Sequence, residues 1–162
     1  MSPPAGPRPF AVTITPLLIS LPTADRVRAH AFYQDALGLE AVGELADDGV
    51  PEPLVFVVND ATRLMLIPTG GFGWVTEGHT VATAGTSECL LGISAGSEAE
   101  VDAVVERAEG AGAAIRLEPG EQAWGYAASF ADPDGHLWMV TAAGGTLSDR
   151  TDLGRTRAAG TR

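Results

Sequence analysis

The sequence predicts an α+β protein in which one strand-helix-strand-strand-strand unit occurs twice. Two observations support this prediction. An apolar strand candidate followed by a capped helix and three further strand candidates occurs in residues 12–68 and again in residues 88–143. In addition, Leu17-Leu18-Ile19-Ser20 is echoed by Leu90-Leu91-Gly92-Ile93-Ser94 at the start of the second unit. At 162 residues the chain is long enough to bury a core of its own.

The first unit begins with an apolar, β-branched strand at 12–21, which Pro22 closes. Thr23-Ala24-Asp25 then caps a helix that runs to about Leu37 and ends at Gly38, because glycine favours the left-handed cap position. Further strands are expected at 39–45, 54–59 and 63–67.

The second unit starts with a strand at 89–95. Ser97 and Glu100 then form a capping box, and the following helix ends at Gly110 or Gly112. Strands are expected at 114–117, 124–131 and 137–142. The remaining expectations are a flexible N-terminus at 1–11, an inter-module linker at 69–87 and a disordered tail at 144–162.

Composition limits the classes of function. The formal net charge is −11, which disfavours nucleic acid and anionic membranes because phosphates need a basic partner. An acidic surface suits a cationic ligand, and it also simply keeps a protein soluble. The sequence has no apolar run of the roughly 20 residues that a membrane helix needs. Cys89 is the only cysteine, which excludes an internal disulfide and suits the cytoplasm; it is predicted to be buried and structural.

The motif Asp132-Pro133-Asp134-Gly135 predicts a tight turn between two strands, since aspartates at such corners bond their own backbone. We therefore interpret the two carboxylates as turn formers and not as a general acid-base pair. The longer string from Asp132 to Val140 resembles the C-terminal signature of the vicinal-oxygen-chelate superfamily, which includes glyoxalase I, extradiol dioxygenases and bleomycin-resistance proteins. Similar matches lie at 21–25, 32–39, 64–74 and 87–102.

The resemblance covers roughly residues 12–143 and implies two βαβββ modules that form a curved mixed sheet around a cleft. It also implies a homodimer in which two chains build each cavity. In the metalloenzymes of this superfamily four strand positions bind a metal. In this sequence the four positions fall on Leu18, on Met65 or Leu66, on Leu90 with Cys89 and Glu88 as the nearest donors, and on Met139.

None of the four preferred positions bears a histidine or a carboxylate, whereas a zinc, iron or manganese site needs three or four such donors. His30, His79 and His136 have no metal-site spacing and do not replace them. We therefore expect neither a metal nor another cofactor.

An apolar cleft in place of a metal site predicts a site for a small molecule. The candidate ligand-binding residues are Met65, Phe72, Trp74, Trp124, Tyr126 and Met139. Methionine adapts to irregular ligands, and Trp and Tyr offer large flat surfaces. The alternative is that the aromatic residues pack the sheet or a dimer contact. Phe32, Phe130 and Trp138 are assigned to the core.

Three functions are compatible with the resemblance. The first is a metal-free binding protein that sequesters an apolar or aromatic, possibly cationic, natural product, as bleomycin-resistance proteins do. The second is a metal-independent isomerase or cyclase of secondary metabolism. The third is a glyoxalase-type or dioxygenase-type metalloenzyme whose ligands lie at other positions. Because one fold hosts many chemistries, only the residues of the binding site can distinguish these three functions.

Overall fold

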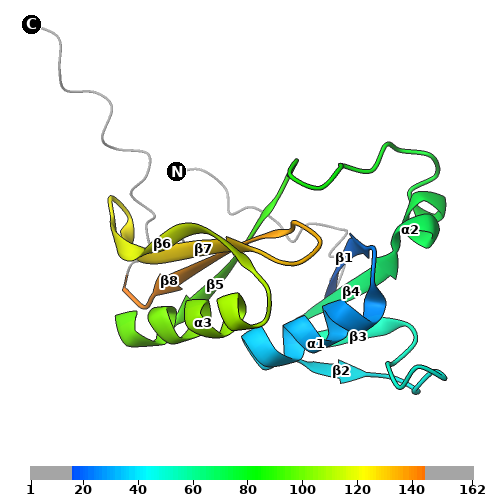
Figure 1. The fold of residues 1–162 in the computed structure, drawn as a ribbon, viewed down its shortest axis with the longest axis horizontal. Helices are drawn as coiled ribbons and strands as arrows, with labels where there is room; N and C mark the ends of the chain where they lie inside the picture. Colours follow the sequence, from blue (N-terminus) through cyan, green and yellow to red (C-terminus); the bar gives the residue numbers. More distant parts are fainter. Residues whose placement is uncertain (1–15, 145–162) are drawn as a thin grey trace, which may run out of the picture.

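The computed structural model describes residues 16–144, which form two four-stranded sheets and three helices (Figure 1). None of these helices is both long enough and apolar enough to cross a membrane. The elements of the first half are β1 (Leu17–Thr23), α1 (Arg26–Leu37), β2 (Glu40–Val42), β3 (Leu54–Asn59), β4 (Thr62–Pro68) and α2 (Thr69–Val75). Those of the second half are β5 (Leu90–Ala95), α3 (Glu98–Gly110), β6 (Ala114–Gln122), β7 (Gly125–Ala131) and β8 (Leu137–Ala142).

The two sheets have the same topology, which confirms the predicted duplication. The strand orders are β1-β4-β3-β2 and β5-β8-β7-β6. In each sheet the first strand runs parallel to the last strand of its module, and the other neighbours are antiparallel. Within residues 16–144, β1 and β5 are therefore edge strands of two separate sheets.

The two main helices begin and end where the sequence predicts. Asp25 accepts a hydrogen bond from the Arg28 backbone N–H at the start of α1, and Gly38 ends this helix with a φ of 65°. Ser97 Oγ accepts from the Glu100 N–H at the start of α3. The Glu100 carboxylate closes the capping box on the N–H of Gly96, one residue before the cap. Side-chain acceptors at these positions satisfy donors that a helix start leaves free.

One hydrophobic core joins the two modules. Phe32 and Tyr33 of α1 are fully buried, and their rings contact Phe56 of the first sheet and Phe130 and Trp138 of the second. The core assignment of Phe32, Phe130 and Trp138 is thus confirmed. Helices α1 and α3 lie next to each other (Figure 1), and Arg107 Nε donates to the Ala36 carbonyl between them. The modules are consequently held by packing as well as by the chain that links them.

Five expectations about local structure were wrong. The glycine-broken loop after β4 forms the short helix α2, because its glycines adopt no positive φ there. Strand β2 is limited to three residues, while β6 extends to Gln122 through two register shifts. Pro22 lies inside β1, which is possible on an edge strand. Cys89 is exposed and not buried, because it precedes β5 at the end of the linker. The predictions for 1–11 and for 145–162 lie outside the described residues.

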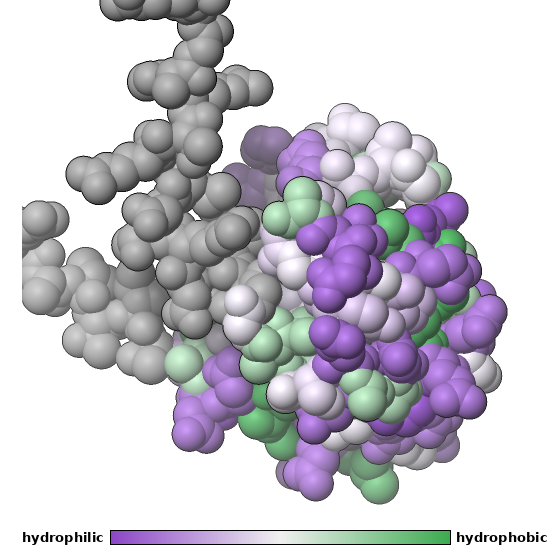
Figure 2. All heavy atoms as spheres, turned by 90° about the vertical axis from the view of Figure 1, so that its left-hand side faces the viewer, coloured by the Kyte–Doolittle hydropathy of each residue, from purple (hydrophilic) through white to green (hydrophobic). Residues whose placement is uncertain are grey.

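The surface follows the acidic composition. On the side where α3 and the β6–β7 hairpin lie in Figure 1, hydrophilic residues dominate and apolar ones form small separate areas (Figure 2). A polar outer surface leaves the apolar sheet faces and the inter-module region as the places to search for a ligand site.

Candidate functional site

Two Leu-Met pairs occupy equivalent places in the two sheets. In the first sheet Ser20 of β1 pairs with Met65 of β4, and Leu18 lies two residues earlier on the same face. In the second sheet Gly92 of β5 pairs with Met139 of β8, and Leu90 again lies two residues earlier. Alternation along a strand places each pair on the face opposite the buried core residues.

The exposure of these residues agrees with that placement. Leu64 and Leu66 on the core side of β4 are 1% exposed, whereas Met65 between them is half-buried. Leu18 and Leu90 are 46% and 49% exposed. Each sheet therefore has an exposed leucine on its edge strand and a half-buried methionine on the next strand, both on the face opposite the core.

The six predicted ligand-binding residues do not come together in the described chain. Met65 and Met139 lie on two different sheets. Trp74 on α2 is 82% exposed, whereas Phe72 of the same helix lines a pocket between the modules. Trp124 lies in the β6–β7 turn, and its buried Nε1 has no hydrogen-bond partner among the described residues.

Tyr126 is on the face of the second sheet opposite to Met139. Its hydroxyl donates a 2.7 Å hydrogen bond to Asp102 Oδ1 on α3. This bond to a carboxylate, together with desolvation and nearby negative charge, raises the pKa of Tyr126 above its usual value. The tyrosine therefore fixes β7 to α3 and does not share a cleft with the methionine.

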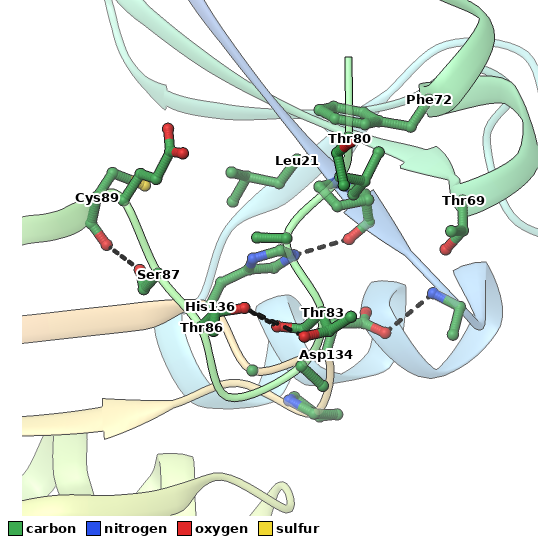
Figure 3. A pocket seen from close by; sticks show the side chains of 18 of the residues that line it. Leu21, Thr69, Phe72, Thr80, Thr83, Thr86, Ser87, Cys89, Asp134 and His136 are labelled. Atoms are coloured by element: carbon green, nitrogen blue, oxygen red, sulfur yellow. Dashed lines mark hydrogen bonds between the residues drawn. The ribbon is translucent and has the colours of Figure 1, made fainter. Parts of the chain in front are cut away.

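A pocket of about 630 Å³ lies where the two modules meet (Figure 3). Its walls come from the end of β1, from α2, from the linker at 80–89 and from the turn at 133–136. Leu21 and Phe72 provide part of the apolar lining, and His136 and Asp134 project from the turn. The size is in the range of sites that hold small organic molecules.

The turn between β7 and β8 connects the pocket to the first module. Asp134 accepts hydrogen bonds from Thr23 Oγ1 at 2.6 Å and from the Ala24 N–H at 2.9 Å. His136 Nε2 lies 2.7 Å from the Pro22 carbonyl oxygen. These contacts fix the pocket wall to the end of β1.

A second polar cluster lies beneath this turn. Asp132 Oδ1 accepts from the backbone N–H groups of Asp134 and His136, as predicted for a turn-forming aspartate. Its Oδ2 accepts a 2.6 Å bond from the Tyr33 hydroxyl, which in turn accepts from Trp138 Nε1 at 3.3 Å. Burial raises the pKa of Tyr33 well above its usual value, and the adjacent Asp132 carboxylate raises it further. The prediction that Asp132 forms the turn is confirmed, whereas Asp134 bonds to Thr23 and Ala24 of the first module and not to the backbone of its own turn.

The profile of the Glyoxalase/Bleomycin resistance protein/Dioxygenase superfamily matches residues 15–140. The chain belongs to this superfamily. No curated protein sequence matches it significantly. The fold agrees with solved members: a glyoxalase-related enzyme from Fulvimarina pelagi is 24% identical, with a TM-score of 0.67 and coverage of 78% of this chain and 86% of that one.

Two other solved structures share the superfamily fold. Hypothetical protein SA1046 from S. aureus is 22% identical, with a TM-score of 0.68 over 82% of this chain and 95% of its own. TnmS3, an antibiotic binding protein from Streptomyces sp. CB03234, is 23% identical, with a TM-score of 0.54 over 82% of this chain and 98% of its own.

The residues at the four positions that the sequence resemblance assigns to a metal do not fit a metal ion. Leu18 and Leu90 offer only hydrocarbon, and Met65 and Met139 offer soft thioethers in place of imidazole or carboxylate ligands. Residues 16–144 hold no group of three or more His, Cys, Asp or Glu side chains placed to bind a metal.

Most of the inter-module pocket has no signal in the sequence. Its linker wall has no periodicity, and nothing in the sequence indicates that Arg28 lines a pocket. The one signal in the sequence was the turn motif at 132–135, which the linker contacts: a Cβ built on Gly135 would lie 3.5 Å from the Gly85 nitrogen.

Proposed function

We propose that this member of the superfamily is a metal-free binding protein of the cytoplasm that sequesters an apolar or aromatic, cationic natural product. One observation carries the proposal. The Leu18-Met65 and Leu90-Met139 pairs occupy equivalent places on the outer faces of the two sheets. The sequence resemblance assigns these positions to the ligands of the superfamily's metalloenzymes.

The chemistry of these faces suits an apolar guest. The first face continues from Met65 onto Val55, its partner on β3, and onto Val42, the next partner on β2. Burying such surface yields about 25 cal/mol per Å² removed from water. The flexible thioether of methionine adapts to the shape of a ring system. The charge of −11 raises the local concentration of a cation.

A homodimer would complete the site. Within residues 16–144 the two faces belong to separate sheets, and β1 and β5 have one free edge each. We infer that the first sheet of one chain faces the second sheet of its partner, so that both Leu-Met pairs border one cleft. Such a pairing would cover Leu18 and Leu90. On an unpaired edge strand, exposed leucines otherwise favour aggregation with other chains.

The likeness to TnmS3, which is an antibiotic binding protein, is consistent with sequestration. Resistance to such a compound would follow if binding removed it from its target. The proposed function is binding alone, without catalysis.

The experiment is a fluorescence titration with the planar cation acridine orange and with a panel of polycyclic aromatic antibiotics. The variant is Met139→Glu, which places a carboxylate in the apolar cleft, and the matched control is Val27→Glu, which adds the same charge at an exposed position on α1. We expect Met139→Glu to weaken binding at least roughly tenfold because a buried unpaired charge is costly. Equal affinity in both variants would contradict the proposed cleft.

The bound compound is then extracted and analysed by mass spectrometry. Recovery of unchanged compound supports sequestration, whereas a new isomer would assign the protein to the enzymes. Sedimentation velocity checks the dimer, which should dissociate in a Leu18→Glu variant if β1 forms part of the contact.

A further inference from the structure

We propose that the inter-module pocket is a second ligand site, separate from the sheet faces, and that it takes a small aromatic carboxylate. The pocket is bounded by both modules and the linker, and Phe72, Leu21 and Val81 give it apolar walls (Figure 3). A flat ring of one or two fused cycles fits a volume of about 630 Å³.

Arg28 supplies the group that would recognise the carboxylate. It lies on α1 and lines the pocket, and its side chain is 50% exposed. Only its Nη2 has partners among the described residues, Asp134 Oδ1 and the Pro133 carbonyl, both at 3.5 Å. Distances at this limit are weak hydrogen bonds, so most of the guanidinium donors stay available. A guanidinium binds a carboxylate through two parallel N–H bonds.

The neighbouring carboxylate of Asp134 does not compete strongly for this arginine. Its side chain is only 7% exposed, and its oxygens accept the short bonds from the Thr23 hydroxyl and the Ala24 N–H. These donors hold the Asp134 carboxylate in place, and its ion pair with Arg28 spans 3.5 Å. Glu88 also lines the pocket, and both Glu88 and Arg28 are exposed enough for solvent to screen them. Arg28 is the only arginine among the pocket-lining residues, so it is the group that would bind an anion there.

The hydroxyl groups of the linker add polar groups to the pocket lining. Thr80 and Thr83 line the pocket, and the Thr83 side chain lies 3.3 Å from that of Thr86. Because the Thr86 hydroxyl donates to the Thr83 carbonyl, the Thr83 hydroxyl keeps its own proton and can donate it to a carboxylate oxygen of the ligand. Apolar walls with a few convergent polar groups are typical of small-molecule sites.

The single cysteine provides a local test. Cys89 is exposed and lines the same pocket, so an occupant should slow its reaction with the thiol reagent 5,5′-dithiobis(2-nitrobenzoate). The full-length protein is titrated with three probes of equal shape: 2-naphthoate, 2-naphthalenemethanol and 2-naphthylmethylamine. We expect 2-naphthoate to protect Cys89 at the lowest concentration, roughly tenfold below the alcohol, the scale of a charge-assisted hydrogen bond.

Variants separate charge recognition from general packing. Arg28→Gln should remove the roughly tenfold advantage of the acid over the alcohol and leave protection by the alcohol unchanged. The matched control is Arg116→Gln, on the exposed side of β6 and outside the pocket, which should behave as the parent protein. Phe72→Ala should weaken the binding of all three probes, because it removes part of the apolar wall.

Three outcomes would overturn the proposal: no protection of Cys89 by 2-naphthoate, tightest binding by the amine, or an unchanged preference for the acid in Arg28→Gln. Protection that is lost in Met139→Glu and kept in Arg28→Gln would place the acid on the sheet faces and would also overturn it.

Discussion

The Tyr33 hydroxyl lies 2.6 Å from Asp132 Oδ2, and this bond joins α1 of the first module to the turn before β8 of the second. Both residues are buried. The same carboxylate receives two backbone N–H groups of the turn, and the same hydroxyl accepts from Trp138. The pair therefore acts as a polar clamp within an otherwise apolar interface between modules.

Replacing Tyr33 by phenylalanine should destabilise the protein by about 1–3 kcal/mol, because a buried carboxylate oxygen and an indole N–H lose their partner together. Urea unfolding measures the change. The matched control is Tyr126→Phe, whose hydroxyl bonds to Asp102 at an exposed site and should matter much less. Equal stability of the two variants would show that the clamp contributes nothing.

The raised pKa of Tyr33 predicts sensitivity to alkali. The folded protein keeps the phenol proton at a pH where the unfolded chain has released it. The stabilisation is therefore complete below the usual pKa of 10.0 and is lost as the pH rises above it. Unfolding free energy measured from pH 8 upward should fall above about pH 10, and Tyr33→Phe should reduce that slope. A slope unaffected by the variant would contradict this assignment.

The contribution of the hydrogen bond between Thr23 and Asp134 to the free energy of unfolding should also be measurable by urea unfolding. Thr23→Val keeps the shape of the side chain and removes the donor of a 2.6 Å bond to a nearly buried carboxylate. We expect the free energy of unfolding to fall by about 1–3 kcal/mol in Thr23→Val and to change little in Thr62→Val on the neighbouring strand. The Thr62 hydroxyl makes no hydrogen bond within residues 16–144, so the pair isolates the inter-module bond. A loss as large in Thr62→Val would contradict it.

Gly135 and Gly73 should respond to alanine with opposite signs. Gly135 has a φ of 94° and faces the linker at 3.5 Å, so Gly135→Ala should cost about 1–2 kcal/mol. Gly73 lies in α2, and no atom lies within 4 Å of the position that an added Cβ would take. Gly73→Ala should therefore stabilise the protein by up to about 1 kcal/mol. Thermal melts of the two variants provide the measurement. A melting temperature that does not fall in Gly135→Ala would refute the assignment of Gly135, and one that falls in Gly73→Ala would refute that of Gly73.

Local signals in the sequence predicted most of the fold. The Asp25 and Ser97 caps, Gly38, and the turn at 132–135 all act over a few residues, and each lies where it was expected. The resemblance assigned Leu18 and Leu90, and Met65 or Leu66 and Met139, to corresponding places, and the strand registers agree for Met65.

The site could be predicted only in part, because it depends on contacts between distant segments. Nothing near Tyr126 in sequence indicates that the register of β7 against β8 places it on the face opposite Met139, next to Asp102 on α3. Likewise, the exposure of Cys89 and the position of Arg28 result from where the linker crosses the turn. Such long-range packing has no periodic pattern along the chain.

The arrangement of one shared core and an exposed linker has a practical consequence. Residues 82–89 are exposed, whereas Tyr33, Trp138 and the α1–α3 contact hold the modules together without any help from the peptide bond between them. A chain divided at this linker would therefore give two fragments able to reassociate through their buried surfaces. The protein could then serve as a split reporter whose halves regain structure when fused partners meet.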